Sequence, residues 1–263
     1  AAGSANRGSA GGWIDLTNRP RSPGSTLKPF IYGMAFDDGV ASPDTRIADA
    51  PRRFATYRPD NFDRTFRGDV TVAQALQHSL NVPAVSALDA VGAQRFAAAL
   101  SFAGADLSMP LTADDDAGLA IALGGAGMTV RDVALLYSAL GDDGRALPLH
   151  WLKSETEAAL TKPDKATQIM SAQSARQIVD ILGSAPAPAG RMPALLTQEA
   201  PVIAFKTGTS YGFRDAWAAG TGNGSAVVVW IGRADSSPRP GVTGRDAALP
   251  TLFDVFDAIA RIT

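Results

Sequence analysis

The sequence contains no cysteine among its 263 residues. This absence excludes disulfide bonds, thiolate catalysis, zinc fingers and iron–sulfur clusters within the chain. Only two histidines are present, His78 and His150, and neither belongs to an H-E-x-x-H pattern. We therefore expect no catalytic metal, and we interpret each histidine as an ordinary surface or boundary residue.

Long apolar runs and an excess of positive charge are lacking as well. The longest strongly apolar stretch, residues 226–231, is far shorter than the ~20 residues that a membrane span requires. The formal net charge is −2, so no global positive field attracts a nucleic acid or an anionic membrane. Apolar residues make up 46% of the chain, which is typical of a folded domain rather than a disordered segment. The start at Ala1, without a methionine, predicts a piece of a longer protein.

Hydrophobic periodicity predicts helices over most of the first two thirds. Residues 1–24 are rich in glycine, serine and arginine and are expected to form a loop. Apolar residues at helical spacing then predict a helix from Ser25 to about Asp37. Residues 41–69 lack a sustained period and are interpreted as a long irregular surface segment. Further helices are expected from a capping box at Thr71, from Pro83 after a kink at 79–82, and at 93–102, 130–140 and 171–182.

The last third carries the pattern of strands. Residues 202–209, 216–220 and 226–231 are predicted strands, and Gly222-Asn223-Gly224 is a strong hairpin signal between the last two. A final amphipathic helix begins at about Pro250 and is expected to cover the sheet. The order of helix, helical region, antiparallel strands and helix predicts an α+β fold.

One serine lies in a pattern typical of α/β-hydrolases. Gly208-Thr209-Ser210-Tyr211-Gly212 matches G-x-S-x-G and follows a predicted strand. However, another strand follows instead of a helix, and both histidines precede Ser210, whereas hydrolases need the histidine after the serine. We interpret Ser210 as a coincidental match.

Ser25 is the stronger candidate for a nucleophile. Lys28 follows three residues later, and this spacing on a helix brings the amine within reach of the hydroxyl. The first turn also offers free N–H groups and the positive end of the helix dipole, which stabilise an oxyanion. Taken alone, the S-x-x-K pattern occurs by chance in many chains and is more typical of a helix cap followed by a surface lysine.

Two further fragments favour a catalytic Ser25. Ser79-Leu80-Asn81 lies at the predicted kink, and Lys206-Thr207-Gly208 lies on the first predicted strand. Together with Ser25 and Lys28 they form S-x-x-K, S-x-N and K-T-G in sequence order. We expect Gly208 to let a ligand backbone approach the strand, Lys206 to add positive charge, and Asn81 to offer an amide both a donor and an acceptor.

With these motifs the sequence resembles the transpeptidase domain of class A, bifunctional penicillin-binding proteins, most nearly the 1C type. The resemblance covers roughly residue 8 to the end and includes the segments 21–30, 57–62, 77–84, 123–127 and 205–210. It implies a serine penicillin-binding/β-lactamase-like fold, in which helices cover an antiparallel sheet and a helical lobe spans about 70–185. It also implies a periplasmic acyl-enzyme D,D-transpeptidase that needs no cofactor. Such an enzyme crosslinks peptidoglycan stem peptides ending in D-Ala-D-Ala and is acylated by β-lactams.

The resemblance implies a role for each residue of the reacting centre. Ser25 would be the nucleophile and Lys28 its base. Ser79 would relay a proton between Lys28 or Lys206 and the leaving amine. Two converging lysines lower each other's pKa, so that one can be neutral near pH 7.

The resemblance also implies how the substrate is bound. Lys206, Thr207 and Thr209 would hold its carboxylate, and Asn81 would hold its amide. The backbone N–H groups of Ser25 and Thr209 would form the oxyanion hole. The arginine-rich and aromatic segment 52–67 is interpreted as a structural loop packed across the helical lobe, with a wall of a substrate groove as the alternative.

Complete members of this family carry more chain before the serine. That chain holds one or two sheet strands, a glycosyltransferase domain and a membrane anchor. We therefore expect residues 1–263 to be an N-terminally truncated transpeptidase domain. Its missing sheet edge would be supplied by a separate chain, or this piece is simply trimmed. On either alternative, activity of the isolated piece is not expected from the sequence alone.

Three alternative functions remain open from the sequence. A class A β-lactamase needs a glutamate that activates the deacylating water, and Glu155, Glu157 and Glu199 all lack the E-x-x-L-N setting. A carboxypeptidase would use the same serine chemistry with water as the acceptor. A non-catalytic penicillin-binding module would retain the motifs around an inactive site.

Overall fold

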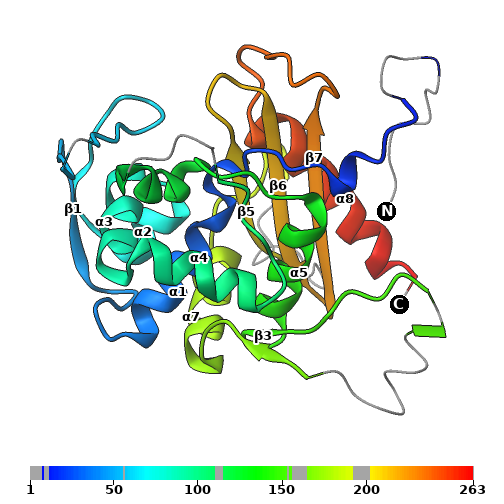
Figure 1. Ribbon diagram of the computed structural model, residues 1–263, viewed down its shortest axis with the longest axis horizontal. Helices are drawn as coiled ribbons and strands as arrows, with labels where there is room; N and C mark the ends of the chain where they lie inside the picture. Colours follow the sequence, from blue (N-terminus) through cyan, green and yellow to red (C-terminus); the bar gives the residue numbers. More distant parts are fainter. Residues whose placement is uncertain are drawn as a thin grey trace.

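The computed structural model describes residues 8, 12–55, 57–109, 115–152, 154–155, 165–191 and 202–262. It has the predicted α+β architecture, with a central sheet between two layers of helices (Figure 1). The helices are α1 (Lys28–Asp37), α2 (Val72–Gln77), α3 (Asn81–Val91), α4 (Ala93–Phe102), α5 (Val130–Gly141), α7 (Ala172–Gly183) and α8 (Leu249–Ala260). The strands are β1 (Arg46–Asp49), β2 (Gly68–Thr71), β3 (Arg145–Ala146), β4 (Thr167–Gln168), β5 (Ala204–Thr209), β6 (Asp215–Gly222) and β7 (Ser225–Gly232).

The central sheet has the order β5-β6-β7 and is antiparallel throughout. The predicted hairpin joins β6 to β7 through Asn223 and Gly224. Both residues have positive φ, 48° and 68°, as a two-residue turn that matches the strand twist requires. Within the described residues, β5 therefore forms one edge of the sheet.

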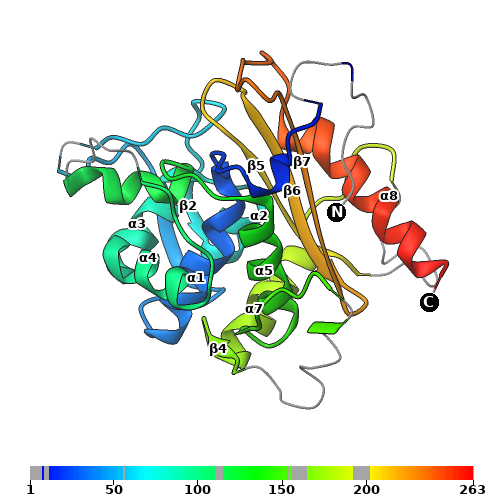
Figure 2. The same cartoon turned by 45° about the vertical axis from the view of Figure 1, so that its right-hand side comes forward.

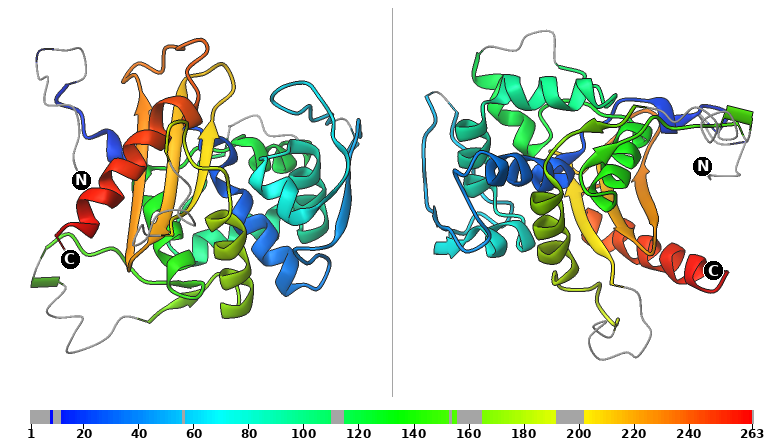
Figure 3. Two further views of the ribbon diagram at one scale, coloured as in Figure 1. Left: turned by 180° about the vertical axis from the view of Figure 1, so that it is seen from behind. Right: turned by 90° about the horizontal axis from the view of Figure 1, so that it is seen from below.

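The two faces of the sheet pack against different helices (Figures 2 and 3). Phe205 and Ala218 face α8, where they form a small apolar cluster with Phe253 and Phe256. Residues of opposite parity join the main core, which also holds α1, α3, α5 and α7. Because side chains alternate along a strand, Lys206 shares the parity of Ala204, which lies in this main core. Lys206 therefore lies on the face of the sheet that packs against α1, α3, α5 and α7, opposite the face that α8 covers.

Most predicted helices are present, and two begin at different residues than expected. The capping box at Thr71 is confirmed, since its hydroxyl accepts the Gln74 N–H and the Gln74 side chain accepts the Thr71 N–H. Helix α3 begins at Asn81 rather than Pro83. Pro83 is its third residue, where a missing N–H costs no helical hydrogen bond. The helix expected from Ser25 begins as a 3-10 turn, η2 (Gly24–Leu27), and α1 follows it directly.

The prediction of an irregular surface segment at 41–69 is wrong in two respects. Strands β1 and β2 pair across it, with Arg46 opposite Thr71. Two polar side chains of the segment, Asp49 and Asn61, are also buried, with exposed fractions of 0% and 4%. The sequence did not reveal these strands, because four residues give too few alternations of apolar and polar side chains to detect.

The length and hydrophobicity of a helix decide whether it can cross a membrane. None of the helices in the described ranges is both long and apolar enough to cross a bilayer.

Candidate active site

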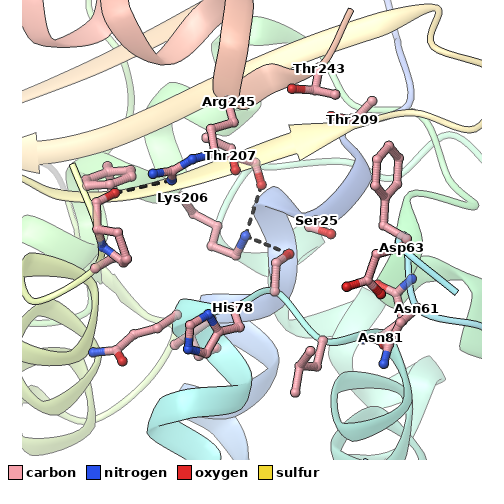
Figure 4. A pocket seen from close by; sticks show the side chains of 18 of the residues that line it. Ser25, Asn61, Asp63, His78, Asn81, Lys206, Thr207, Thr209, Thr243 and Arg245 are labelled. Carbon is pink, nitrogen blue, oxygen red and sulfur yellow. Dashed lines mark hydrogen bonds between the residues drawn. The ribbon is translucent and has the colours of Figure 1, made fainter. Parts of the chain in front are cut away.

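A cavity of about 560 Å³ lies beside the free edge of β5 (Figure 4). Its walls come from β5, from the turn between α2 and α3, from η2 and from the turn η5 (Gly244–Ala248) before α8. The lining includes most of the residues that the sequence motifs singled out, namely Ser25, Ser79, Asn81, Lys206, Thr207 and Thr209. Three motifs far apart in sequence therefore meet at one cavity.

Ser25 lies in the η2 turn, half-buried at the cavity wall. Its neighbour Gly24 has φ +55° and packs so closely on Thr209 that a Cβ at Gly24 would lie 2.6 Å from the Thr209 nitrogen. Only glycine combines this φ with such an approach. The turn thereby brings the Ser25 backbone next to the end of β5.

Lys28 lies one turn further on and is fully buried. Its Nζ donates to the backbone oxygen of Ser79 at 2.7 Å, to that of Leu80 at 3.1 Å and to Asn81 Oδ1 at 2.7 Å. Burial holds the pKa of Lys28 well below its ordinary value; the charge on Lys206 also lowers it, whereas Asp49 opposes the shift. The turn between α2 and α3 thus supplies the hydrogen-bond acceptors for the Lys28 amine.

Lys28 and Ser25 are not joined by a hydrogen bond in the described chain. Within the described residues, the Ser25 hydroxyl makes no hydrogen bond. The Lys28 amine instead satisfies its three donors on the 79–81 turn, because a buried amine needs acceptors. The i, i+3 spacing predicted proximity, and η2 runs directly into α1, so the acceptors on the 79–81 turn rather than the spacing decide where the amine points.

The Ser79 hydroxyl lies between two amines. Lys206 Nζ donates to Ser79 Oγ at 2.8 Å and to the Thr207 oxygen at 3.0 Å, while Lys28 Nζ is 3.5 Å from the same Oγ. Burial lowers the pKa of Lys206 to about 7, and the nearby Arg245 guanidinium contributes to this shift. Ser79 has a positive φ of 57°, which is uncommon for a residue with a Cβ. Ser79 thus combines an uncommon backbone conformation with a hydroxyl that contacts both lysines.

The backbone N–H of Thr209 lies on the edge of β5 that faces away from β6. The Ser210 N–H donates to the Asp215 oxygen, and ladder bonds alternate along an antiparallel pair. The Thr209 N–H must therefore point away from β6, toward the open edge. The Thr209 hydroxyl is already engaged, since it accepts the Gly244 N–H at 2.9 Å.

Gly208 has a packing role that was not expected. A Cβ at this position would lie 2.2 Å from the Pro23 oxygen and 2.9 Å from the Thr26 side chain. The glycine therefore allows β5 to pack on the protein's own η2 turn. The expected approach of a ligand backbone stays a prediction. Its side of the strand faces the core, which the sequence pattern did not show.

Ser210 and the histidines lie in ordinary surroundings. Ser210 is 3% exposed, and its Oγ accepts the Asp215 N–H, which closes the turn after β5. His78 is exposed at the cavity wall, and burial together with Arg67 lowers its pKa. Among the described residues, no cluster of three or more histidine or acidic side chains is arranged to hold a metal ion.

The glutamates weighed for a β-lactamase do not enter the cavity as far as they are described. Glu155 is exposed, accepts the N–H groups of Trp151 and Leu152, and does not line the cavity. Glu157 and Glu199 lie outside the described residues.

The segment 52–67 forms one wall of the cavity, through Asn61, Phe62, Asp63 and Arg67. The Phe62 ring meets Phe213 edge-to-face, with centroids 5.7 Å apart, so this segment touches the turn after β5. It is therefore more than the structural loop that the sequence favoured.

Three residues near the centre were not assigned a role from the sequence. Asp49 and Asn61 form a buried hydrogen-bonded pair behind Asn81, and Arg245 lies at the cavity wall beside Lys206. Asn61 lies in segment 57–62 (Y-R-P-D-N-F), one of the segments that carry the family resemblance, so the sequence did hold a signal for it. Asp49 and Arg245 belong to no sequence motif that would indicate a role in the site, because only tertiary packing brings them there.

Comparison with known proteins gives the class of this chain. The family model of the penicillin binding protein transpeptidase domain matches residues 9–240. The chain belongs to this family. Penicillin-binding protein 1C of Escherichia coli (strain K12) is 41% identical over 246 residues, which are 93% of this chain and 30% of that protein. Penicillin-binding protein 1B of Vibrio cholerae serotype O1 is 28% identical, over 90% of this chain and 31% of that protein.

A solved structure shares the fold. The PonA1 protein from Mycobacterium tuberculosis, in complex with penicillin V, superposes with a TM-score of 0.72 at 21% identity. The match covers 95% of this chain and 71% of that one. The predicted penicillin-binding transpeptidase fold is therefore confirmed. This chain spans about a third of the length of the curated relatives described above.

Proposed function

We propose that this domain is a serine acyl-enzyme D,D-transpeptidase with Ser25 as its nucleophile. The proposed substrates are peptidoglycan stem peptides ending in D-Ala-D-Ala, and β-lactams would acylate the same serine. The observation that carries the proposal is the convergence of two buried lysines on Ser79 Oγ, in a cavity that Ser25 also lines. Buried amines with lowered pKa values are suited to proton transfer near neutral pH.

Acylation begins at the Ser25 hydroxyl. Lys28 in its neutral form accepts the hydroxyl proton, either directly after a rotation of its amine or through Ser79. The Ser25 oxygen then bonds to the carbonyl carbon of the penultimate D-Ala. The C–N bond to the terminal D-Ala breaks, and its nitrogen takes a proton from Ser79 Oγ, which a lysine ammonium replaces.

The second half of the reaction releases the enzyme. The amine of an acceptor stem peptide attacks the ester carbon and gives up a proton to the Ser79 and lysine pair. The new peptide bond forms as the ester bond breaks, and the Ser25 oxygen regains a proton. Attack by water would give a carboxypeptidase product instead.

Charge and backbone geometry fit the proposed substrate. Lys206 as an ammonium, together with Thr207 and Thr209, would hold the C-terminal carboxylate, while Asn81 would hold the donor amide. The Thr209 N–H at the free strand edge and the Ser25 N–H in the η2 turn would stabilise the oxyanion. The donor peptide would lie along the edge of β5 as an added strand.

The wider setting is also a proposal. By likeness to the class A relatives, the domain would act in the periplasm as part of a longer protein with a membrane anchor and a glycosyltransferase domain. The helical region of about 70–185 would be a lobe inserted between Ser25 and the strands. An additional strand supplied by another segment would pair with β7, whose outer edge has no partner strand in the described chain.

Labelling with a fluorescent penicillin tests the function. We expect one adduct per chain by intact mass, mapped to Ser25, that persists because no glutamate among the described cavity residues is placed to activate water. Ser25→Ala should abolish labelling and preserve the fold, since the small hydroxyl that is lost makes no hydrogen bond to the described residues.

Ser210→Ala is the matched control, because it removes a hydroxyl from the competing motif. Labelling should persist in this variant. An adduct on Ser210 would contradict the assignment, and many rapid turnovers of nitrocefin would favour a β-lactamase.

A further inference from the structure

Asp49 is a buried carboxylate that has no cationic hydrogen-bond partner among the described residues. It is 0% exposed, and its oxygens accept two bonds from Asn61 Nδ2, both 2.8 Å, and one from the Arg67 backbone N–H at 2.9 Å. No lysine or arginine of the described ranges forms an ion pair with it. Because burial of an unpaired charge is costly, a carboxylate here points to a role that an apolar residue would not fill.

Asn61 connects this carboxylate to the site. Its Nδ2 faces Asp49, so its Oδ1 remains to accept the Asn81 N–H at 2.7 Å. Asn81 begins α3, and its N–H has no partner within the helix. The Asn81 side chain in turn accepts from Lys28 Nζ at 2.7 Å. Asp49, Asn61, Asn81 and Lys28 therefore form a continuous hydrogen-bonded chain.

The Asp49 carboxylate also acts on Lys28 through charge. It raises the pKa of Lys28, against the opposing effects of burial and of Lys206. It also raises the pKa of Tyr32, which lies one turn after Lys28 on α1. The charged and titratable groups around Lys28 are thus Asp49, Lys206 and Tyr32, with Arg245 acting on Lys206.

We propose that Asp49 and Asn61 are positioning residues of the reaction: Asn61 holds Asn81 against Lys28, and Asp49 orients Asn61 and stabilises the ammonium form of Lys28. Neither residue touches the reacting atoms. The carboxylate limits how readily the proposed base loses its proton, and the amide fixes the turn that carries Ser79. This inference rests on the proposed function, since it assigns Lys28 as the base.

The test is the pH dependence of acylation by a chromogenic penicillin, followed by stopped flow. In wild type the acid limb should report loss of the Lys28 proton. Asp49→Asn removes the negative charge, so the ammonium is less stable and the acid limb should move to lower pH, by about half a unit or more. The maximal rate should fall severalfold, because the new NH₂ group faces donors from Asn61 and Arg67.

Two variants provide controls for charge. Asp49→Glu retains the carboxylate and should return the acid limb to the wild-type position. Asp69→Asn makes the same substitution on the neighbouring strand β2, where the carboxylate is exposed and pairs with Arg46. It should leave the profile unchanged. An Asp49→Asn profile that superimposes on those of wild type and Asp69→Asn overturns the proposal.

Asn61→Ser tests the bridge separately. It keeps the Asp49 charge but is too short to join Asp49 to Asn81, so we expect at least about a tenfold slower acylation with an unmoved acid limb. Acylation within twofold of wild type, measured where the variant is folded, would overturn the positioning role. If Asp49→Asn does not fold, the acylation rate of Asn61→Ser alone decides whether the proposal holds. A wild-type chain that never forms a Ser25 adduct refutes the proposed function instead.

Discussion

At the scale of single residues, the site depends on two amines that share one hydroxyl. Lys28 and Lys206 are both buried, and both contact Ser79 Oγ. Their pKa values are lowered chiefly by burial, yet their surroundings differ, because Asp49 acts on Lys28 and Arg245 acts on Lys206. One amine can then be neutral while the other stays charged, as the proposed division between base and carboxylate binder requires.

Arg245→Ala should shift the alkaline limb of the acylation profile. Removing this positive charge raises the pKa of Lys206 above about 7, so the ammonium persists to higher pH. Because Arg245 is exposed, we expect a shift below about one unit. Stopped-flow acylation across pH measures it.

Arg233→Ala is the matched control for this prediction. Arg233 bonds Ser237 and does not line the cavity, so its loss should not move the limb. Equal profiles for the two variants would show that Lys206 does not control the alkaline limb.

At the scale of elements, the geometry depends on the packing of β5 against the η2 turn. Gly24 and Gly208 allow this approach, because a Cβ at either one would overlap backbone atoms of the opposing segment. The contact places the end of the strand next to Ser25. It thus sets the distance between the two N–H groups of the proposed oxyanion hole.

Gly208→Ala should therefore separate β5 from the η2 turn. The added Cβ would overlap the Pro23 oxygen, and we expect a loss of about 2–3 kcal/mol in the free energy of unfolding. Acylation should slow by more than about tenfold. Urea denaturation and penicillin labelling give the two quantities.

Gly224→Ala separates packing from backbone strain. Gly224 also has a positive φ, but a Cβ there meets open space, so only about 1–2 kcal/mol of conformational cost is expected. Labelling by this variant should match wild type. A Gly208→Ala variant that acylates normally would show that the close approach is dispensable.

At the scale of the whole molecule, the sheet separates a large core from a small one. The large core contains α1, α3, α5 and α7, and α8 covers the other face. Both lysines lie on the side of the large core and are buried. Placing ionisable amines there lowers stability whenever they are charged.

Thermal stability should consequently increase from about pH 7 to about pH 9. The ordinary pKa of lysine, 10.5, applies to the unfolded chain, whereas that of folded Lys206 is about 7. Between these values the unfolded chain binds more protons, so stability rises with pH, here on the order of 2 kcal/mol. Scanning calorimetry at a series of pH values measures the rise.

Lys206→Met is the comparison for this prediction. It replaces the amine with an apolar side chain of similar length, so the increase should become smaller, with Lys28 still contributing in the same direction. An unchanged slope would mean that folded Lys206 titrates normally.

Local patterns were enough to predict much of the fold. Capping boxes, helical periodicity and the Gly222-Asn223-Gly224 turn act over a few residues, so they can be detected in sequence. Strands β1 and β2 were missed because four residues carry too little alternation. The start of α3 was misplaced because proline is tolerated anywhere in a first turn.

The sequence by itself determined the family, the fold class and the three motifs around Ser25, because each depends on residue identity and spacing along the chain. Only the tertiary structure decided which atoms meet. It directed the Lys28 amine to the 79–81 turn instead of to Ser25, placed Gly208 against Pro23, and buried Asp49 behind the site. Those outcomes follow from long-range packing and from the need of buried polar groups for partners, which no local pattern records.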